Sequence, residues 1–221
     1  MTVQYVNHAE SSQTGTSSVT GSFSNSGGNC LLANFFGLFS GSGMVPDSVS
    51  DSAGNTWTKI KDDSGVSFWI ALDIAADAAN VVTVAWPNAS TYTNILIGQF
   101  SGVDKIVGYD SAYAPATLHD TGGSPPWTSN SDTTTHDDEL IVCFWTSDNF
   151  WANPASYSTS VLEVVHAHND LAIVTNQIDS AGSADTSMTN TGTGSADGVW
   201  SFPFALLPQR FIQVNQAAAP W

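Results

Sequence analysis

Short apolar stretches recur roughly every ten to fifteen residues, and Gly, Asn, Asp, Ser and Pro separate them. Asn80–Trp86 alternates between apolar and polar positions, which predicts a strand with one solvated face. Leu31–Phe39 and Leu140–Trp145 are apolar on both faces, so we expect them at the centre of a two-layer core. An i, i+3, i+4 pattern never persists for about twelve residues, so no long helix is predicted.

The pattern predicts an all-β fold, a two-layer antiparallel β-sandwich of jelly-roll-like type. The segments expected to form strands are Val3–His8, Asn29–Phe39, Asp47–Asp51, Thr56–Lys61, Val66–Ile74, Asn80–Trp86, Asn94–Ser101, Glu139–Thr146, Ser158–Val165, Leu171–Ile178, Asp185–Thr189 and Val199–Leu207.

The second half of the chain echoes the pattern of the first half. Asn29–Phe36 resembles Glu139–Trp145, and Phe68–Ala75 resembles Leu171–Ile178. Each half then ends in a closing apolar strand. This repetition predicts an internal pseudo-duplication of the sandwich.

Three regions are expected along the chain: an N-terminal strand or arm over 1–27, the sandwich over 28–208, and a C-terminal tail over 209–221. Gly108–Thr135 is long and poor in apolar residues, so we interpret it as an excursion that links the two halves. The tail contains the apolar residues Phe211, Ile212 and Val214, and we expect it to dock on an edge strand or on a neighbouring subunit.

Charge narrows the possible partners. The 221 residues include only four Lys and Arg against 20 Asp and Glu, for a net charge of −16. Nucleic-acid binding depends on cations that neutralise phosphates, so neither nucleic acid nor an anionic membrane is an expected partner. The N-terminus lacks the basic and apolar regions of a signal peptide. Together with the abundance of Ser, Thr, Gly and aromatic residues, this predicts a virion-surface or mature extracellular protein.

Two cysteines, Cys30 and Cys143, lie inside apolar strand candidates. They are interpreted as buried thiols, with a single disulfide between neighbouring strands as the alternative.

Several segments resemble a β-sandwich module that recurs in phage virion proteins and bacterial secreted proteins. These segments are Ser48–Thr58, Phe68–Ala71, Ala79–Val84, Ile97–Val103, Asp137–Val142 and Trp200–Pro208. The resemblance covers roughly residues 28–208 and implies a jelly-roll-like or immunoglobulin-like sandwich used for structure, adhesion or sugar binding. It implies no catalytic residues.

Catalytic motifs are not found, so we expect no enzyme activity. His166, His168 and Asp170 have the spacing of metal ligands on one face of a strand, although a polar face running into a turn explains them equally. Asp62–Asp63 and Asp137–Glu139 are candidate Ca²⁺ ligands, with solvated turns as the alternative. No cofactor is otherwise expected.

Aromatic residues form the better candidate site. Trp127, Phe150, Trp151 and Trp221 lie in predicted loops or the tail, where they could stack on sugars, anchor a protein interface or cap the sandwich. The remaining strand tryptophans are predicted to belong to the core: Trp69, Trp86, Trp145 and Trp200.

These observations favour a non-enzymatic virion structural protein, a head-decoration or tail-associated adhesion component. Its expected partners are protein neighbours, including copies of itself in a homo-oligomer, and neutral glycans. One alternative is a carbohydrate-binding module of a bacterial secreted or surface protein. Another is a sandwich-fold enzyme that degrades polysaccharides.

Overall fold

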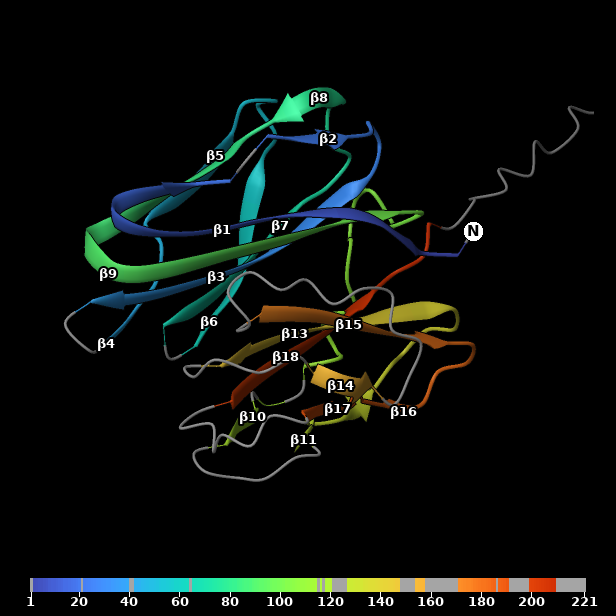
Figure 1. Cartoon of the computed structure of the whole chain (residues 1–221). Coiled ribbons are helices and arrows are strands. Elements are labelled where there is room, and N and C mark those ends of the chain that lie inside the picture. The colour runs from blue at the N-terminus through green and yellow to red at the C-terminus, as the bar shows by residue number, and fades with distance from the viewer. Residues whose placement is uncertain are drawn as a thin grey trace, which may run out of the picture.

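The computed structural model describes residues 2–20, 22–39, 42–63, 65–114, 116, 118–120, 127–147, 154–157, 171–185, 187–190 and 199–209. These residues form an all-β sandwich of antiparallel sheets, as predicted (Figure 1). No helix capable of crossing a membrane occurs among them.

The strands of the first half are β1 (Gln4–Val19), β2 (Phe23–Asn25), β3 (Cys30–Phe39), β4 (Ser42–Met44), β5 (Ser48–Asp51), β6 (Trp57–Asp63), β7 (Val66–Ala71), β8 (Asp77–Asn80) and β9 (Val82–Ser101). The strands that follow are β10 (Leu118–Asp120), β11 (Trp127–Thr128), β12 (Asp132–Thr133), β13 (Glu139–Ser147), β14 (Pro154–Tyr157), β15 (Leu171–Ile178), β16 (Ser183–Ala184), β17 (Ser187–Asn190) and β18 (Val199–Leu206).

The two halves share the order of three strands. The seven-stranded sheet runs β1-β9-β3-β7-β6, with β4 paired to β3 and β5 paired to β9. The four-stranded sheet runs β10-β18-β13-β15. The closing strand, the central strand and the next strand of each half are therefore adjacent in the same order, β9-β3-β7 and β18-β13-β15. This shared order is consistent with the repetition in the sequence.

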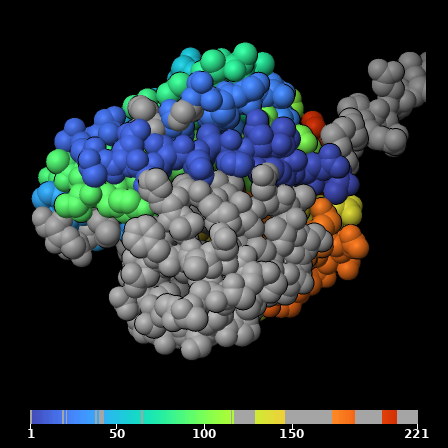
Figure 2. Space-filling model, viewed as in Figure 1, coloured from blue at the N-terminus to red at the C-terminus, as the bar shows by residue number. Residues whose placement is uncertain are grey.

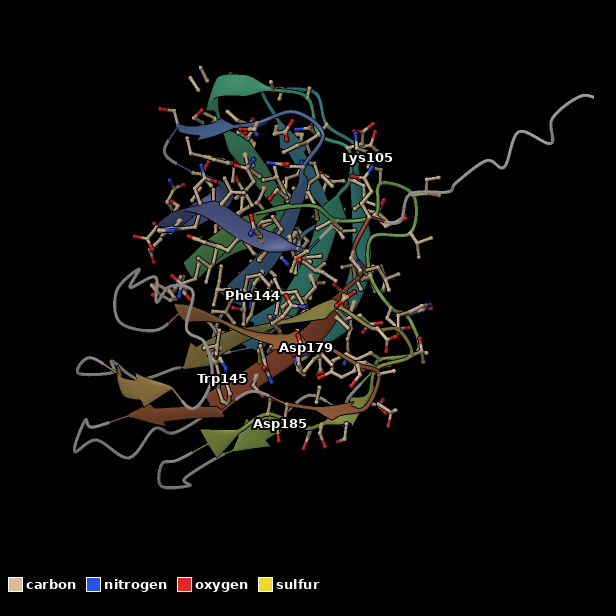
Figure 3. All side chains as sticks on the ribbon, turned by 90° about the vertical axis from the view of Figure 1, so that its right-hand side faces the viewer. Lys105, Phe144, Trp145, Asp179 and Asp185 are labelled. Carbon is tan, nitrogen blue, oxygen red and sulfur yellow. The ribbon has the colours of Figure 1, made fainter. Side chains whose placement is uncertain are left out.

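The seven-stranded sheet is buried on both faces. Cys30, Leu32 and Phe36 of β3 face the four-stranded sheet, in a core that also contains Phe144. The alternate residues of β3, such as Leu31 and Phe35, face a second core on the opposite side. In Figure 3, Phe144 and Trp145 likewise lie on opposite sides of the four-stranded sheet.

The second core is covered by strands that bend back over it. Val82 and Val84, at the start of β9, pack against the same cluster as Leu31. The bend falls where β1 and β9 lose regular register, between Gln13 and Ser17. Gly15 adopts a φ of 120° there, and its amide donates to Ser90 Oγ at 3.1 Å. Figure 1 shows β1 and β9 bending together, and Figure 2 shows β1 crossing the surface of the first half.

A turn after β5 shows how the small polar residues of the chain are used. Asp51–Asn55 forms this turn: Gly54 has a φ of 74°, and Asp51 Oδ1 accepts the Asn55 amide at 2.9 Å. Asp51 Oδ2 also accepts the Trp57 indole N–H at 3.2 Å, so one carboxylate orders the turn and the strand after it.

Cys30 and Cys143 are both free and buried, which confirms the interpretation as thiols and excludes the disulfide. Burial raises the pKa of the Cys30 thiol, so it remains protonated in the fold. Trp69, Trp86 and Trp145 are buried, as predicted for core residues.

The core between the two sheets depends on an aromatic contact across the layers. Phe68 of β7 lies 4.5 Å from Phe202 and 4.9 Å from Phe204, measured between ring centroids. We expect Phe68→Ala to lower the free energy of unfolding by about 3–5 kcal/mol, because the substitution would leave a cavity where the ring packs between the two layers. Urea unfolding measures the loss, and Thr58→Ala on the exposed side of β6 is the control, expected within about 0.5 kcal/mol of the parent. A loss for Phe68→Ala that is no larger than for the control would contradict this account of the core.

Candidate functional site

Most of the residues predicted to bind a partner lie outside the described residues. This holds for Phe150, Trp151 and Trp221, for the tail residues Phe211, Ile212 and Val214, and for the metal candidates His166, His168 and Asp170. Trp127 lies in β11, where it pairs with Met188 of β17.

A connecting segment, Gly102–Ala114, carries the candidate sites of the described residues. It leaves β9 and runs along β18: Asp104 N donates to Leu207 O at 2.9 Å, and Asp110 N donates to Ala205 O at 2.8 Å. The segment therefore joins the first half of the chain to the four-stranded sheet. Three features follow one another along it.

The first feature is an apolar tip formed by Ile106 and Val107, whose side chains are 88% and 56% exposed. Its backbone is nevertheless fixed. Asp104 Oδ1 accepts the amides of Ile106 at 2.9 Å and of Val107 at 2.8 Å. Lys105 Nζ lies 2.6 Å from Asp73 Oδ1, which ties the tip to the first half. Figure 3 shows Lys105 far from the interlayer residue Phe144.

Both ends of the described chain lie against Gly102, at the start of the connecting segment. The Gln209 amide donates to Gly102 O at 2.7 Å. A side chain at Gly102 would come within 2.6 Å of Thr2 O, so the N-terminal backbone passes directly over this glycine. Gln209, the first residue of the predicted C-terminal tail, therefore pairs with the start of the connecting segment.

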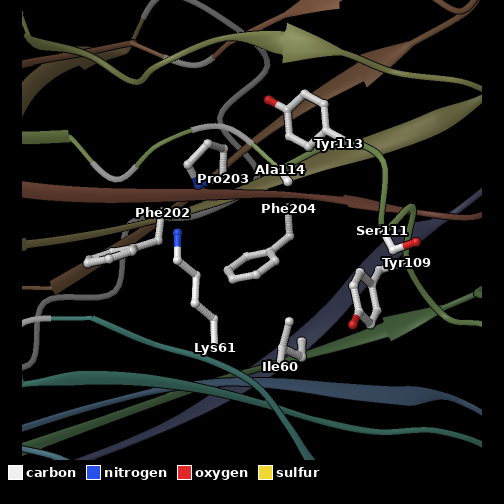
Figure 4. A pocket seen from close by; sticks show the side chains of 9 residues that line it. All are labelled: Ile60, Lys61, Tyr109, Ser111, Tyr113, Ala114, Phe202, Pro203 and Phe204. Atoms are coloured by element: carbon white, nitrogen blue, oxygen red, sulfur yellow. The ribbon is translucent and has the colours of Figure 1, made fainter.

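The second feature is an interlayer cleft between β6 and β18, with a volume of about 230 Å³. Aromatic side chains form much of its wall: Tyr109 and Tyr113 from the connecting segment, and Phe202 and Phe204 from β18. Lys61 extends from β6 toward β18 (Figure 4). A cleft of this size has room for one sugar ring or one amino-acid side chain.

The third feature is an acid–imidazole cluster formed by Asp110, His136 and Glu139. Asp110 belongs to the connecting segment, His136 lies in the turn before β13, and Glu139 is the first residue of β13. His136 Nδ1 lies 3.1 Å from Glu139 Oε1 and 3.8 Å from Asp110 Oδ2. The side chains of Asp110 and Glu139 are 4% and 0% exposed, whereas that of His136 is 37% exposed.

Hydrogen bonds hold this cluster in place. Ala112 N donates to Asp110 Oδ1 at 2.8 Å, and Thr135 donates to Oδ2 from its amide at 2.9 Å and from its hydroxyl at 2.6 Å. The His136 amide donates to Glu139 Oε1 at 3.0 Å.

The two carboxyls have opposite pKa shifts. Burial raises the pKa of Glu139, and the nearby charge of Asp110 raises it further, although hydrogen bonding to His136 opposes both effects. Burial also acts to raise the pKa of Asp110, but the hydrogen bonds from Thr135 and Ala112, together with His136, lower it overall. A cluster of this kind can hold a proton on one of its two carboxyls or bind a divalent cation.

Of the predicted Ca²⁺ candidates, only Glu139 joins such a cluster among the described residues. Asp62 pairs with Lys59 at 2.9 Å and accepts the Ser67 hydroxyl at 2.6 Å. Asp137 accepts the Ala181 amide at 2.8 Å. The sequence offers no signal for Asp110 as the partner of Glu139, because the two residues are distant along the chain and their contact depends on how the connecting segment folds.

Comparisons with protein-family models, with curated proteins and with solved structures find no match to this chain. The strands themselves establish the antiparallel sandwich.

Tyr113 couples the connecting segment to β16 of the two-stranded β12-β16 sheet, and its ionisation provides a test of that contact. Its side chain is 3% exposed, its hydroxyl donates to Ala184 O at 3.0 Å, and burial raises its pKa. We expect Tyr113→Phe to lower the free energy of unfolding by about 1–2 kcal/mol at pH 7, because the buried carbonyl loses its donor.

The sign of the pH dependence follows from the raised pKa. The phenol ionises near pH 10 in the unfolded chain but stays protonated in the fold, so Tyr113 lowers the stability of the parent above about pH 10, a loss that the Phe variant does not have at this position. The stability gap between the two proteins should therefore shift in favour of the variant by about 1.4 kcal/mol from pH 9 to pH 11. Urea unfolding with a reductant at both pH values measures the gap. An unchanged gap would show that Tyr113 is accessible to solvent in the fold.

Proposed function

We propose that this chain is a non-enzymatic structural protein of a virion, a head-decoration or tail-associated adhesion component, and that it docks on protein neighbours through the apolar tip. The observation that carries the proposal is that Ile106 is 88% exposed on a backbone fixed by hydrogen bonds. The virion setting rests on the resemblance of segments such as Ser48–Thr58 to a module of phage proteins.

The apolar tip has the properties of an interface anchor. Large apolar side chains at a binding site contribute most when they insert into a pocket of the partner. Because the backbone is already ordered by Asp104, docking would lose little conformational entropy.

The charges around the tip also favour docking. The chain has a net charge of −16, which opposes non-specific association. At the tip, however, Lys105 is paired with Asp73, and Asp104 accepts backbone amides. The Lys105–Asp73 pair carries no net charge, and amides partly satisfy the Asp104 carboxylate, so docking at Ile106 would desolvate little unpaired charge.

The position of the chain ends fits the same role. Thr2 and Gln209 both lie against Gly102, two residues before Asp104. The docking of residues 209–221 on a neighbouring subunit, which stays a prediction, would start from this side of the connecting segment.

The double substitution Ile106→Ser with Val107→Ser tests the tip. Light scattering coupled to size-exclusion chromatography measures the self-association of the full chain over a range of concentrations. We expect the parent to form a homo-oligomer, and the double variant to weaken this association by at least about tenfold, because two apolar anchors are lost.

Phe39→Ser is the matched control, since Phe39 is 39% exposed and lies at the end of β3 away from the tip. Its association should equal that of the parent. Mass spectrometry of purified particles from the source tests the virion setting separately, with the chain expected beside capsid or tail proteins. A parent that stays monomeric and is absent from particles would refute the proposal.

A carbohydrate-binding module is the second candidate, and the interlayer cleft is the observation that favours it. Half-buried Tyr109 offers an aromatic surface for sugar stacking, and Ser111 and Lys61 offer hydrogen-bond donors. The buried acid–imidazole cluster does not favour the polysaccharide-degrading alternative, because Glu139 is fully buried and a sugar ring cannot lie between it and Asp110.

Glycan binding at the cleft has a direct test in Tyr109→Ala. We expect neutral oligosaccharides to bind the parent and to bind this variant at least about tenfold more weakly, because the stacking surface is removed. Isothermal titration calorimetry measures both affinities. Trp127→Ala is the comparison variant, and the cleft assignment requires that it retain binding. Equal affinities for the parent and Tyr109→Ala would exclude the cleft as the sugar site.

A further inference from the structure

We propose that Asp110, His136 and Glu139 bind one divalent transition-metal ion of the Zn²⁺ class. These three residues are the acid–imidazole cluster, which lies apart from the apolar tip. The proposal does not depend on the virion role.

The distances between the donor atoms suit a single ion. Zn²⁺ binds imidazole nitrogen and carboxylate oxygen at about 2.0–2.2 Å, so neighbouring ligands of a tetrahedral site lie about 3.4 Å apart. His136 Nδ1 is 3.1 Å from Glu139 Oε1 and 3.8 Å from Asp110 Oδ2, values on either side of this spacing. One ligand atom from each residue falls within 4.8 Å of the other two.

The polar groups of the cluster are left partly unsatisfied without an ion. Glu139 is fully buried, yet its Oε2 atom has no hydrogen-bond partner among the described residues. His136 Nδ1 faces oxygens of Glu139, of Asp110 and, at 2.9 Å, of Thr135. A single N–H cannot donate well to all three oxygens, whereas a lone pair on Nδ1 can bind a cation that the carboxylates also share.

The electrostatic argument points the same way. Two carboxylates with 4% and 0% exposure lie beside one half-exposed imidazole, so the buried site carries an excess of negative charge. A dication would neutralise both carboxylates. The exposed edge of His136 gives the ion a path from solvent.

The donor set favours a transition metal over Ca²⁺. Calcium takes six to eight oxygen ligands, and this cluster offers one nitrogen and two carboxylates. Imidazole is a preferred ligand of Zn²⁺ and its neighbours in the first transition row. The amides of Ala112, Thr135 and His136 already orient the carboxylates, as outer hydrogen bonds do in metal sites.

Binding would link two parts of the fold. Asp110 lies on the connecting segment, and His136 and Glu139 precede and open β13. The ion would therefore fasten the segment that bears Tyr109 and Tyr113 to the four-stranded sheet, and it would stabilise the folded chain by mass action.

The test uses the full chain after treatment with EDTA and removal of the chelator. Titration with Co²⁺ is followed by visible absorption, and titration with Zn²⁺ by calorimetry. We expect one ion per chain, and a rise in melting temperature of about 5–10 °C when free Zn²⁺ exceeds the Kd about 100-fold. His136→Ala should weaken binding by at least about 100-fold, because one of three ligands is lost.

The control addresses the other candidate ligands in the chain. A double variant, His166→Ala with His168→Ala, should bind the ion as the parent does. Glu139→Gln keeps the shape of the buried side chain, and circular dichroism checks its fold, so its expected loss of binding reports on the ligand itself. Binding that survives in His136→Ala, or that is lost in the His166/His168 variant, would overturn the assignment. If the parent binds no Zn²⁺ at about 100 μM, a concentration at which only weak sites stay empty, the assignment is also overturned.

Discussion

Because β3 and β7 are apolar on both faces, the seven-stranded sheet has to be covered on each side, and most of the architecture follows from this requirement. The four-stranded sheet covers one face through Phe144, Phe202 and Phe204. The other face is covered by the sheet's own strands, since β9 bends so that Val82 and Val84 pack over Leu31 and Phe35. The bend in turn requires the irregular register around Gly15. A strand apolar on one face only would have allowed a flat sheet with a solvated side.

The same requirement gives the connecting segment its importance. Once the two sheets are stacked, the chain has to cross between them after β9, and it does so along β18 with its backbone amides paired. Residues of this segment contribute to each of the three candidate sites. Ile106 points to solvent, Tyr109 lines the cleft, and Asp110 turns inward to meet His136 and Glu139. Docking, small-molecule binding and ion binding are thus separate proposals for successive residues of one segment.

Apolar periodicity predicts the elements of this fold well where both faces of a strand are buried. Leu31–Phe39 and Leu140–Trp145 lie in strands, and so does most of Val66–Ile74, of which Val66–Ala71 forms β7. The repeated pattern indicates two similar halves, but the order of the strands within each sheet comes from the structure. The sequence does not predict the length of β1, because Glu10–Val19 is mostly Ser and Thr and gains its strand structure only by pairing with β9. Asp110 could not be predicted either, since its role depends on a tertiary contact with Glu139. Loop aromatics such as Trp151 attract notice in the sequence, but aliphatic Ile106 gives no such signal, because its exposure is set by the hydrogen bonds of Asp104.

The scarcity of cations explains why specific contacts matter so much for this chain. With four Lys and Arg against 20 acids, few carboxylates can find an ion pair, and most must be hydrated or accept hydrogen bonds from amides and hydroxyls. Asp51 and Asp104 use amides in this way, at turns where backbone donors converge. Glu139 is different, because it is buried beside a second carboxylate and no Lys or Arg is among its contacts in the cluster. Burying an acid in so acidic a protein costs stability unless a proton or a cation accompanies it. The placement of Glu139 at the start of the central strand β13 therefore ties the folding of the four-stranded sheet to what neutralises this one side chain.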